Sequence, residues 1–417
     1  MSTNASDPAA DARARVAAEV FTLVAAGYLR RHTMIRLCRT TKKINEAILP
    51  LLYKEVEEHM IWGWEKFADE VLDRMNRDDQ VTSVAPYVKG LKSNLGQSFG
   101  QAPDALYAES RLLRALPLFE NLESLHFAWT GVPAVWWEDL WRRGGFPQLR
   151  VLAILVADGD GIDGVIRFAN AREHLKELHL TVWGDPRAPG HALENKLIPE
   201  ITVPGLEKFV GWASFVSALG RMDRLDSVRL LWNDSIPLES TLQRLALSAR
   251  NLREFSSSLY TESCKGELVR AVGTSLGSVT RLTFGFMNVV YEVTRMAENL
   301  HFIPRLRVLK VEETAPVSVL GQRVLIGEWL GSGSEVERII IERHVWERFK
   351  WVEGEEFGWE QVWYRSSAFD FVEEEGGMMT FVPDIAQEVA DWFDFMERKL
   401  NGGEFTNEER QGLDTYN

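Results

Sequence analysis

The sequence predicts an α/β fold in which a parallel sheet is built from repeated strand-and-helix units. The first observation is a short apolar pattern, Leu-x-x-Leu-x-Leu, that returns along most of the 417 residues. The second is the regular distance between its copies, and the third is a change to helical spacing of apolar residues near the N-terminus. The copies begin at Leu122, Leu149, Leu175, Leu225, Leu252, Val279, Leu306 and Val336, and a weaker copy contains Leu206 and Phe209.

The distance between the copies is typical of leucine-rich repeats. From Leu225 to Leu306 each copy begins 27 residues after the one before it. A period in the twenties with this pattern indicates a strand followed by a helical return in every repeat. We therefore predict a leucine-rich-repeat solenoid in which the second and third apolar positions point inward. The alternating positions then form one continuous wall on the side opposite the helices.

The outward positions of this wall are candidates for binding a target protein. They carry a mixed set of polar and charged side chains, with basic residues more frequent in the later half. The candidates are His126, Glu177, His179, Thr181, Arg229, Arg281, Thr283, Lys310, Glu312 and Arg338.

Composition narrows the classes of partner. The formal net charge of −14 argues against nucleic acid, because phosphate binding needs a cationic face. No apolar run is long enough to cross a bilayer, so we expect no membrane partner. Cys38 and Cys264 are the only cysteines, which indicates a reducing compartment without a disulfide framework. We expect a cytoplasmic or nuclear location.

Residues 15–56 have the spacing of short helices. Helices are expected up to Leu29, over residues 33–39 with Thr33 as N-cap, and over residues 41–49, ending near Pro50. These segments resemble an F-box of the fungal type, whose last helix runs into a Pro-Leu-Leu-Tyr phrase. The resemblance lies in Val16–Val24, Tyr28-Leu29, Ile35–Arg39, Lys42–Asn45 and Leu49–Val56.

The resemblance to F-box proteins with leucine-rich repeats implies a function. Such F-box modules dock on the Skp adaptor of cullin-RING ubiquitin ligases, and the repeats select the substrate. The chain would then be a non-catalytic substrate receptor that binds an unknown target protein. Val16 and Ala17 stand where the family commonly has Leu-Pro, so a repeat scaffold without ligase association is the alternative. The implied adaptor-binding residues are Val20, Leu23, Val24, Tyr28, Leu29, Ile35 and Leu37.

The predicted organisation has five parts. Residues 1–14 form a disordered lead-in, 15–56 the F-box-like module, 57–84 linking helices, 85–345 irregular leucine-rich repeats, and 346–417 a C-terminal cap with an acidic tail. A tryptophan cluster at Trp346, Trp351, Trp359 and Trp363 is expected to seal the end of the repeats. No catalytic motif, cofactor or metal site is predicted. Asp158–Gly164 has calcium-loop character but is interpreted as a strand-to-helix loop in which Asp caps the helix.

Overall fold

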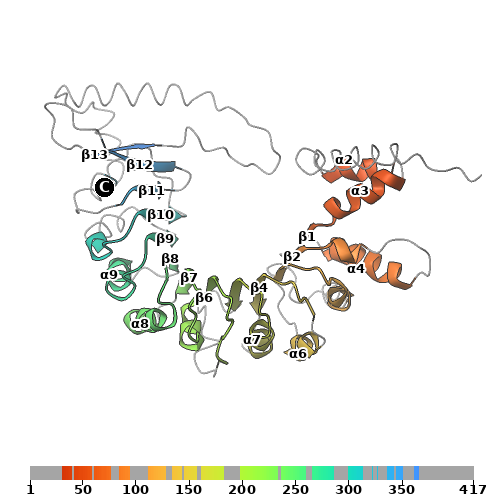
Figure 1. Ribbon diagram of the computed structural model, residues 1–417, viewed down its shortest axis with the longest axis horizontal. Coiled ribbons are helices and arrows are strands. Elements are labelled where there is room, and N and C mark those ends of the chain that lie inside the picture. The colour runs from red at the N-terminus through yellow and green to blue at the C-terminus, as the bar shows by residue number, and fades with distance from the viewer. Residues whose placement is uncertain are drawn as a thin grey trace, which may run out of the picture. The chain divides into compact units, whose positions relative to one another are not determined.

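The computed structural model describes residues 31–39, 42–58, 61–76, 84–93, 111–127, 134–142, 145–156, 161–182, 198–232, 236–259, 265–285, 299–312, 322, 326, 336–341, 344–350 and 361–365. The chain divides into two compact units. The first contains Met1–Leu206 and Glu373–Gly377, and the second contains Glu207–Val372 and Met378–Asn417. Each unit has its own mostly parallel strands and its own helices, which is an α/β architecture (Figure 1).

The described helices that precede most of the sheet in the first unit are α2 (Arg31–Cys38), α3 (Lys42–Leu52) and α4 (Ile61–Asn76). Helix α3, predicted over residues 41–49 with its end near Pro50, continues through Pro50 to Leu52. The ring costs one backbone hydrogen bond near the end of the helix, and burial of Ile48 offsets that loss. The ring of Phe67 in α4 stacks on Tyr53 and Phe119 at centroid distances of 6.4 and 5.8 Å, respectively. Aromatic packing therefore joins α4 to the residue after α3 and to the residue after the 3-10 helix Leu116–Leu118.

The described strands of the first unit are all parallel to their neighbours. They are β1 (Glu55–Glu58), β2 (Gly90–Ser93), β3 (Ser124–Phe127), β4 (Val151–Val156) and β5 (Glu177–Val182). The sheet therefore begins before the predicted start of the repeats at residue 85. β1 escaped prediction because Val56 is the single apolar anchor in Glu-Val-Glu-Glu. One register row places five buried side chains side by side: Val56, Leu91, Leu125, Leu152 and Leu178.

Aromatic side chains pack the helices α6 (Ala134–Arg142) and α7 (Ile162–Asn170) of the first unit. Phe168 lies 5.5 Å from Trp137 and 6.2 Å from Phe146 between ring centroids, and all three are buried. The N-cap of α7 is Gly161, which makes no side-chain hydrogen bond. The predicted capping of this helix by an aspartate is therefore wrong, because the backbone turns into the helix one residue before Ile162 without a side-chain acceptor.

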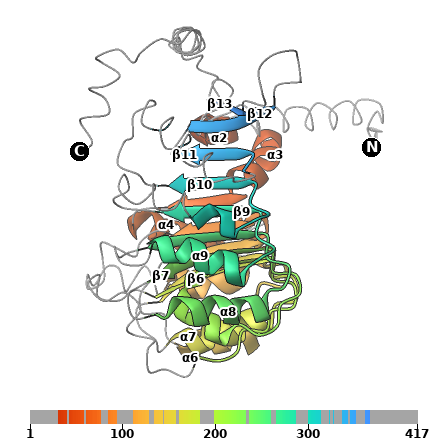
Figure 2. The same cartoon turned by 90° about the vertical axis from the view of Figure 1, so that its left-hand side faces the viewer.

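The second unit continues the strand pattern with β6 (Lys208–Trp212), β7 (Ser227–Trp232), β8 (Glu254–Leu259), β9 (Arg281–Gly285), β10 (Val308–Glu312) and β11 (Arg338–Ile341), which pair in parallel. The weak copy at Leu206 and Phe209 thus contributes a strand. A single 3-10 helix, η6 (Ala213–Ala218), connects β6 to β7, which explains the short interval between those copies. Helices α8 (Leu238–Ser248) and α9 (Lys265–Ser275) lie on one side of the strands (Figure 2).

Two antiparallel strands follow β11: β12 (His344–Lys350) and β13 (Gln361–Arg365). Trp346 in β12 is fully buried, and its Nε1 donates a hydrogen bond of 3.0 Å to the Gln322 side-chain oxygen. The amide nitrogen of Gln322 lies 3.0 Å from Nδ1 of His344. Trp346 therefore helps to cover the last parallel strand. Trp351 and Trp359 lie outside the described residues, as do residues 1–14 and 366–417.

Hydrogen bonds from side chains to backbone carbonyls join the turns that precede neighbouring strands. In the first unit, the Asn121 and Asn170 amides donate to the carbonyls of Pro86 and Glu200, both at 2.8 Å. In the second, Asn251 donates to the Asp223 carbonyl and Ser278 to the Leu252 carbonyl, at 3.2 and 2.7 Å. These bonds satisfy turn carbonyls that no strand partner reaches. They fix the stacking of one repeat-like segment on the next within each unit.

Candidate functional site

The alternate side chains of the parallel strands form a partly exposed surface, called here the open face. Along β5 and β7 the side chains alternate strictly between buried and half-buried positions. Helices α6 to α9 lie on the other side of the strands of their own unit (Figures 1 and 2). All ten predicted target-binding residues occupy half-buried or exposed strand positions on the open face: His126, Glu177, His179 and Thr181 in the first unit, and Arg229, Arg281, Thr283, Lys310, Glu312 and Arg338 in the second.

A histidine pair lies on the open face of the first unit. His126 in β3 and His179 in β5 are both register partners of Ala153 in β4. Because Ala153 is small, the two rings approach across it to 6.2 Å between centroids, edge to face. Glu177 lies beside the pair, with its Oε2 atom 3.5 Å from Nε2 of His179.

Burial and charge affect this pair. Burial chiefly lowers the pKa of His126, and the nearby Lys92 ammonium lowers it further, while Glu177 and Glu57 act in the opposite direction. Lys92 itself pairs with Glu57 at 2.6 Å. Sequence reasoning missed both residues because β1 and β2 lack the full apolar pattern. The pairing of Val56 with Leu91 in the structure shows that Glu57 and Lys92 occupy neighbouring outward positions of β1 and β2.

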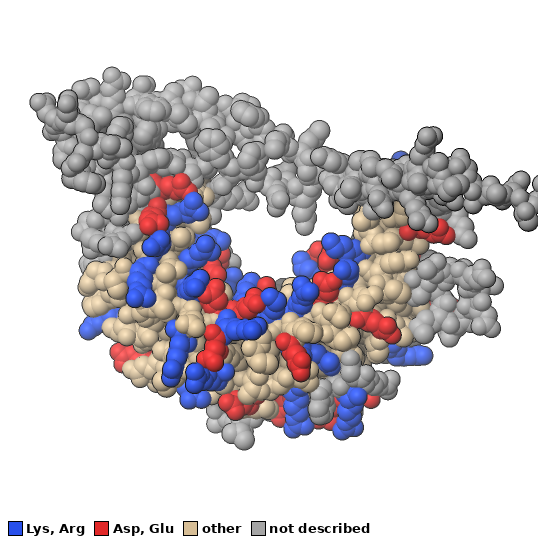
Figure 3. Space-filling view, in the orientation of Figure 1, with Lys and Arg blue, Asp and Glu red and all other residues tan. Residues whose placement is uncertain are grey.

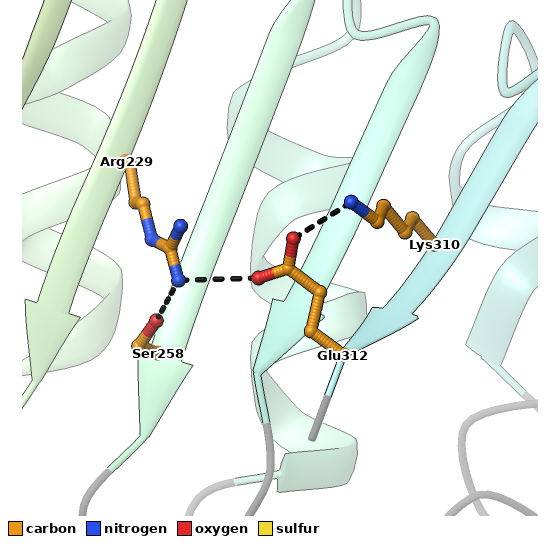
Figure 4. Close-up of polar contacts among 4 residues, drawn as sticks. All are labelled: Arg229, Ser258, Lys310 and Glu312. Carbon is orange, nitrogen blue, oxygen red and sulfur yellow. Dashed lines mark hydrogen bonds and ion pairs between the residues drawn. The ribbon is translucent and has the colours of Figure 1, made fainter. Parts of the chain in front are cut away.

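A bridged carboxylate lies on the open face of the second unit. Glu312 at the end of β10 accepts from the Arg229 guanidinium in β7 at 3.1 Å and from the Lys310 ammonium at 2.9 Å (Figure 4). The same Arg229 nitrogen donates to the Ser258 hydroxyl in β8, also at 3.1 Å. These residues are far apart in sequence, and the parallel register brings them together.

Small residues make room for this bridge. In register, Ser256 and Thr283 lie between Arg229 and Lys310, while Ser258 is paired with Gly285. A Cβ atom on Gly285 would lie 3.1 Å from the Ser258 hydroxyl, which is tighter than an ordinary contact. Because these residues are small, the side chains of Arg229 and Glu312 can lie across the two strands between them. Ser258 was not among the predicted contacts, although the run Ser256-Ser257-Ser258 is a signal for a small-residue surface.

The open face of the second unit carries more basic than acidic residues. Positive and negative side chains lie close together on the side of the strands away from the helices (Figure 3). Arg281 is exposed and has no ion pair among the described residues, whereas Arg338 pairs with Glu347 of β12. The outward positions of β6 to β11 hold five basic residues, Lys208, Arg229, Arg281, Lys310 and Arg338, and two acidic ones, Glu254 and Glu312.

The N-terminal helices offer a separate apolar surface. Ile35 in α2 is 39% exposed, and Leu37 on the same helix is half-buried. Large exposed hydrophobic side chains are rare in the described part of the chain, where Leu247 of α8 is the other example. Val20, Leu23, Val24, Tyr28 and Leu29 lie outside the described residues. Cys38 has a free thiol whose pKa is raised by burial, so this sulfur is a poor nucleophile.

Within the described ranges, no group of three or more His, Cys, Asp or Glu side chains has the arrangement that a metal ion needs. In the same ranges, no helix combines the length and apolarity required to cross a bilayer. No protein-family model matches the chain, and no curated protein matches it. The open faces and the α2 surface are the exposed features of the described residues on which a proposal of function rests.

Proposed function

We propose that this chain is the substrate-recognition subunit of a cullin-RING ubiquitin ligase. In this proposal the N-terminal helices bind a Skp-type adaptor, and the open faces of a leucine-rich-repeat solenoid bind a target protein. The chain itself is not an enzyme, and ubiquitin is transferred by other subunits. Cytoplasm and nucleus are both compatible with this role.

The observation that carries the adaptor half is the exposure of Ile35. Full burial of a side chain of this size is worth about 1.5–3 kcal/mol relative to full exposure, and a partner that covers the exposed 39% of Ile35 would gain part of this. Ile35 also belongs to the segment Ile35–Arg39 that resembles an F-box. An adaptor groove that covers Ile35 and the neighbouring Leu37 would supply the missing burial.

The open faces support the target-binding half. Alternating burial leaves a row of half-buried polar side chains on each strand, and their backbone is already held rigidly by the sheet. A rigid surface loses little conformational entropy when it binds a partner. Repeat proteins commonly use such extended surfaces to hold other proteins.

The alternative is a leucine-rich-repeat interaction scaffold without ligase association. It is favoured by Val16-Ala17, which replace the Leu-Pro that commonly opens the F-box helix. Proline at a helix start presets the backbone dihedral, so its loss weakens one element of the adaptor-binding geometry. The alternative predicts the same open faces but no adaptor complex.

A pull-down with purified Skp adaptor separates the two functions. We expect the full chain to bind and the Ile35→Asp variant to lose binding, because a carboxylate cannot enter an apolar groove without a large desolvation cost. Leu247→Asp is the matched control, since it places the same charge on the other large exposed hydrophobic position, in α8. Circular dichroism checks that both variants fold.

The outcomes lead to different conclusions. Loss of binding in Ile35→Asp with retention in Leu247→Asp supports the receptor. No binding by the unmodified chain excludes the adaptor half and leaves the scaffold. Retained binding in Ile35→Asp, or equal loss in both variants, would contradict adaptor binding through Ile35.

A further inference from the structure

We propose that the open face of β7 to β11 binds an acidic segment of the target protein, with Glu312 acting as an internal carboxylate that competes for the same cations. This inference deepens the proposed target binding and rests on it, but it does not depend on the adaptor. The occupant is defined by its chemistry: an extended peptide stretch in which carboxylates alternate with neutral side chains.

The first support is that this face already holds a carboxylate. The Glu312 side chain is 24% exposed and lies between Arg229 and Lys310 at 3.1 and 2.9 Å. Its donors come from β7 and β10 (Figure 4). The serine, threonine and glycine residues on the strands between them have short side chains, or none, that leave room above the sheet. A carboxylate from another chain would meet the same donors at the same height above the sheet.

The second support is the exposed cation Arg281. The outward positions of β6 to β11 carry five basic and two acidic residues, of which Arg338 is also paired with Glu347 of β12, in a chain whose net charge is −14. Arg281 is exposed between the Glu254 and Val308 positions of the neighbouring strands. A cationic face attracts acidic partners.

The pattern of charges favours a peptide over a nucleic acid. Glu254 and Glu312 interrupt the basic residues, and a continuous row of phosphates could not avoid them. A peptide can place neutral residues beside these two glutamates and carboxylates beside Arg229, Arg281 and Lys310. Neighbouring strands lie about 4.8 Å apart, so β7 to β11 offer a path of about 19 Å.

Binding to a defined probe tests the proposal. The probe is a fluorescein-labelled peptide of alternating glutamate and serine, about eight residues long, and a lysine-serine peptide is its control. We expect the full chain to raise the anisotropy of the acidic peptide and not that of the basic one. Arg281→Glu should weaken binding about fivefold to tenfold, because reversal removes one favourable exposed charge pair and adds a repulsive one. Arg244→Glu is the matched control, since the exposed Arg244 lies on α8.

The internal carboxylate provides a test in the opposite direction. Glu312→Gln should tighten binding about threefold to fivefold, because Arg229 and Lys310 then have no carboxylate of their own. Glu239→Gln makes the same change in net charge on α8 and should leave the affinity unchanged. An equal gain in the two variants would show a general charge effect and overturn the proposal.

Three further outcomes would also overturn it. Equal weakening by Arg281→Glu and Arg244→Glu would remove the face from the binding site. A DNA oligonucleotide that binds more tightly than the peptide and loses affinity in Arg281→Glu would make nucleic acid the occupant. Acidic-peptide binding that neither Arg281→Glu nor Glu312→Gln changes would place the site elsewhere on the chain.

The adaptor pull-down keeps this proposal separate from the ligase function. Arg281→Glu and Glu312→Gln lie on strands β9 and β10 and should retain whatever adaptor binding the unmodified chain has. Peptide binding without adaptor binding would support the acidic-segment site in a scaffold. Adaptor binding without specific peptide binding would leave the receptor function intact and contradict this inference.

Discussion

The open face of β1 to β5 carries histidines and a surplus of carboxylates, whereas the open face of β6 to β11 carries a surplus of cations. In the first unit the charged outward residues are Glu55, Glu57, Glu177 and Lys92, and strands β6 to β11 contain no histidine. The inward rows of both units are buried and mostly apolar, with Ser257 of β8 as a buried polar residue in the second unit. The same backbone register thus supports two surfaces of different charge, because outward positions take no part in the core.

The helical sides of the two units also differ. In the first unit, Trp137, Phe146 and Phe168 fill the space around α6 and α7 with large rings. In the second unit, α9 approaches the η7 turn (Leu300–Phe302) so closely that Gly273 faces the Phe302 backbone. The packing around α6 and α7 therefore depends on aromatic volume, whereas the packing of α9 on η7 depends on close approach of the backbone. Substitutions that add or remove atoms should therefore act differently in the two units.

The largest effect is expected for Gly273→Ala in the second unit. The new Cβ would lie 2.4 Å from the Phe302 carbonyl oxygen, so α9 or the turn must move, at a cost of about 2–3 kcal/mol. Gly277→Ala is the matched control, because nothing lies within 4 Å of the Cβ it adds. That variant should be neutral or gain about 0.4–1 kcal/mol through the unfolded state. Urea denaturation measures both, and equal stabilities would disprove close backbone packing at α9.

A buried charge in the first unit gives the next effect. Arg172 is 8% exposed, its guanidinium lies 4.5 Å above the Phe168 ring, and its Nε and Nη2 atoms have no hydrogen-bond partner. Burial lowers its pKa, which reflects the cost of keeping this charge away from water. Arg172→Met should raise the free energy of unfolding by about 1–2 kcal/mol.

The control for Arg172 is Arg167→Met on the neighbouring helix. Arg167 is exposed and pairs with Glu138 at 3.1 Å, and exposed pairs are worth only about 0.2–1 kcal/mol. We expect a small loss of stability in this variant. A loss in Arg172→Met as large as that of a core truncation would show that the stacked cation is needed for packing around Phe168.

The smallest effect is a pH dependence confined to the open face of the first unit. The pKa of His126 lies below its ordinary value of 6.5 in the folded chain, so the unfolded chain binds more protons between these two pKa values. The free energy of unfolding should have its full value above pH 6.5. It should decrease as the pH falls toward and through the lower pKa that His126 has in the folded chain. Denaturation at a series of pH values should show a shallower decline for His126→Gln.

Lys92→Gln offers a second measurement of the same effect. It removes the Lys92 charge, which lowers the pKa of His126, and with it the ion pair to Glu57, whose own charge raises that pKa. The pKa of His126 should therefore move toward its ordinary value, and the acid-induced loss of stability should shrink. An unchanged or steeper loss would show that other groups control the acid response.

Most of the strand positions could be predicted from the sequence. A row such as Leu225, Val228 and Leu230 determines both the place of β7 and the side on which Arg229 lies, because side chains alternate along a strand. The prediction failed where few apolar anchors remain, as at β1, and where a helix continues through Pro50. In both places neighbouring packing stabilises a structure that local preference disfavours.

The sequence by itself therefore determined an α/β architecture, the inward rows and the outward candidates on each strand, since all of these follow from local periodicity. Only the tertiary structure decided which outward residues meet. It placed Arg229 against Glu312, the two histidines across Ala153, and Lys92 beside Glu57. These contacts depend on strand register and on small residues between the partners, and such properties arise only when distant segments pair.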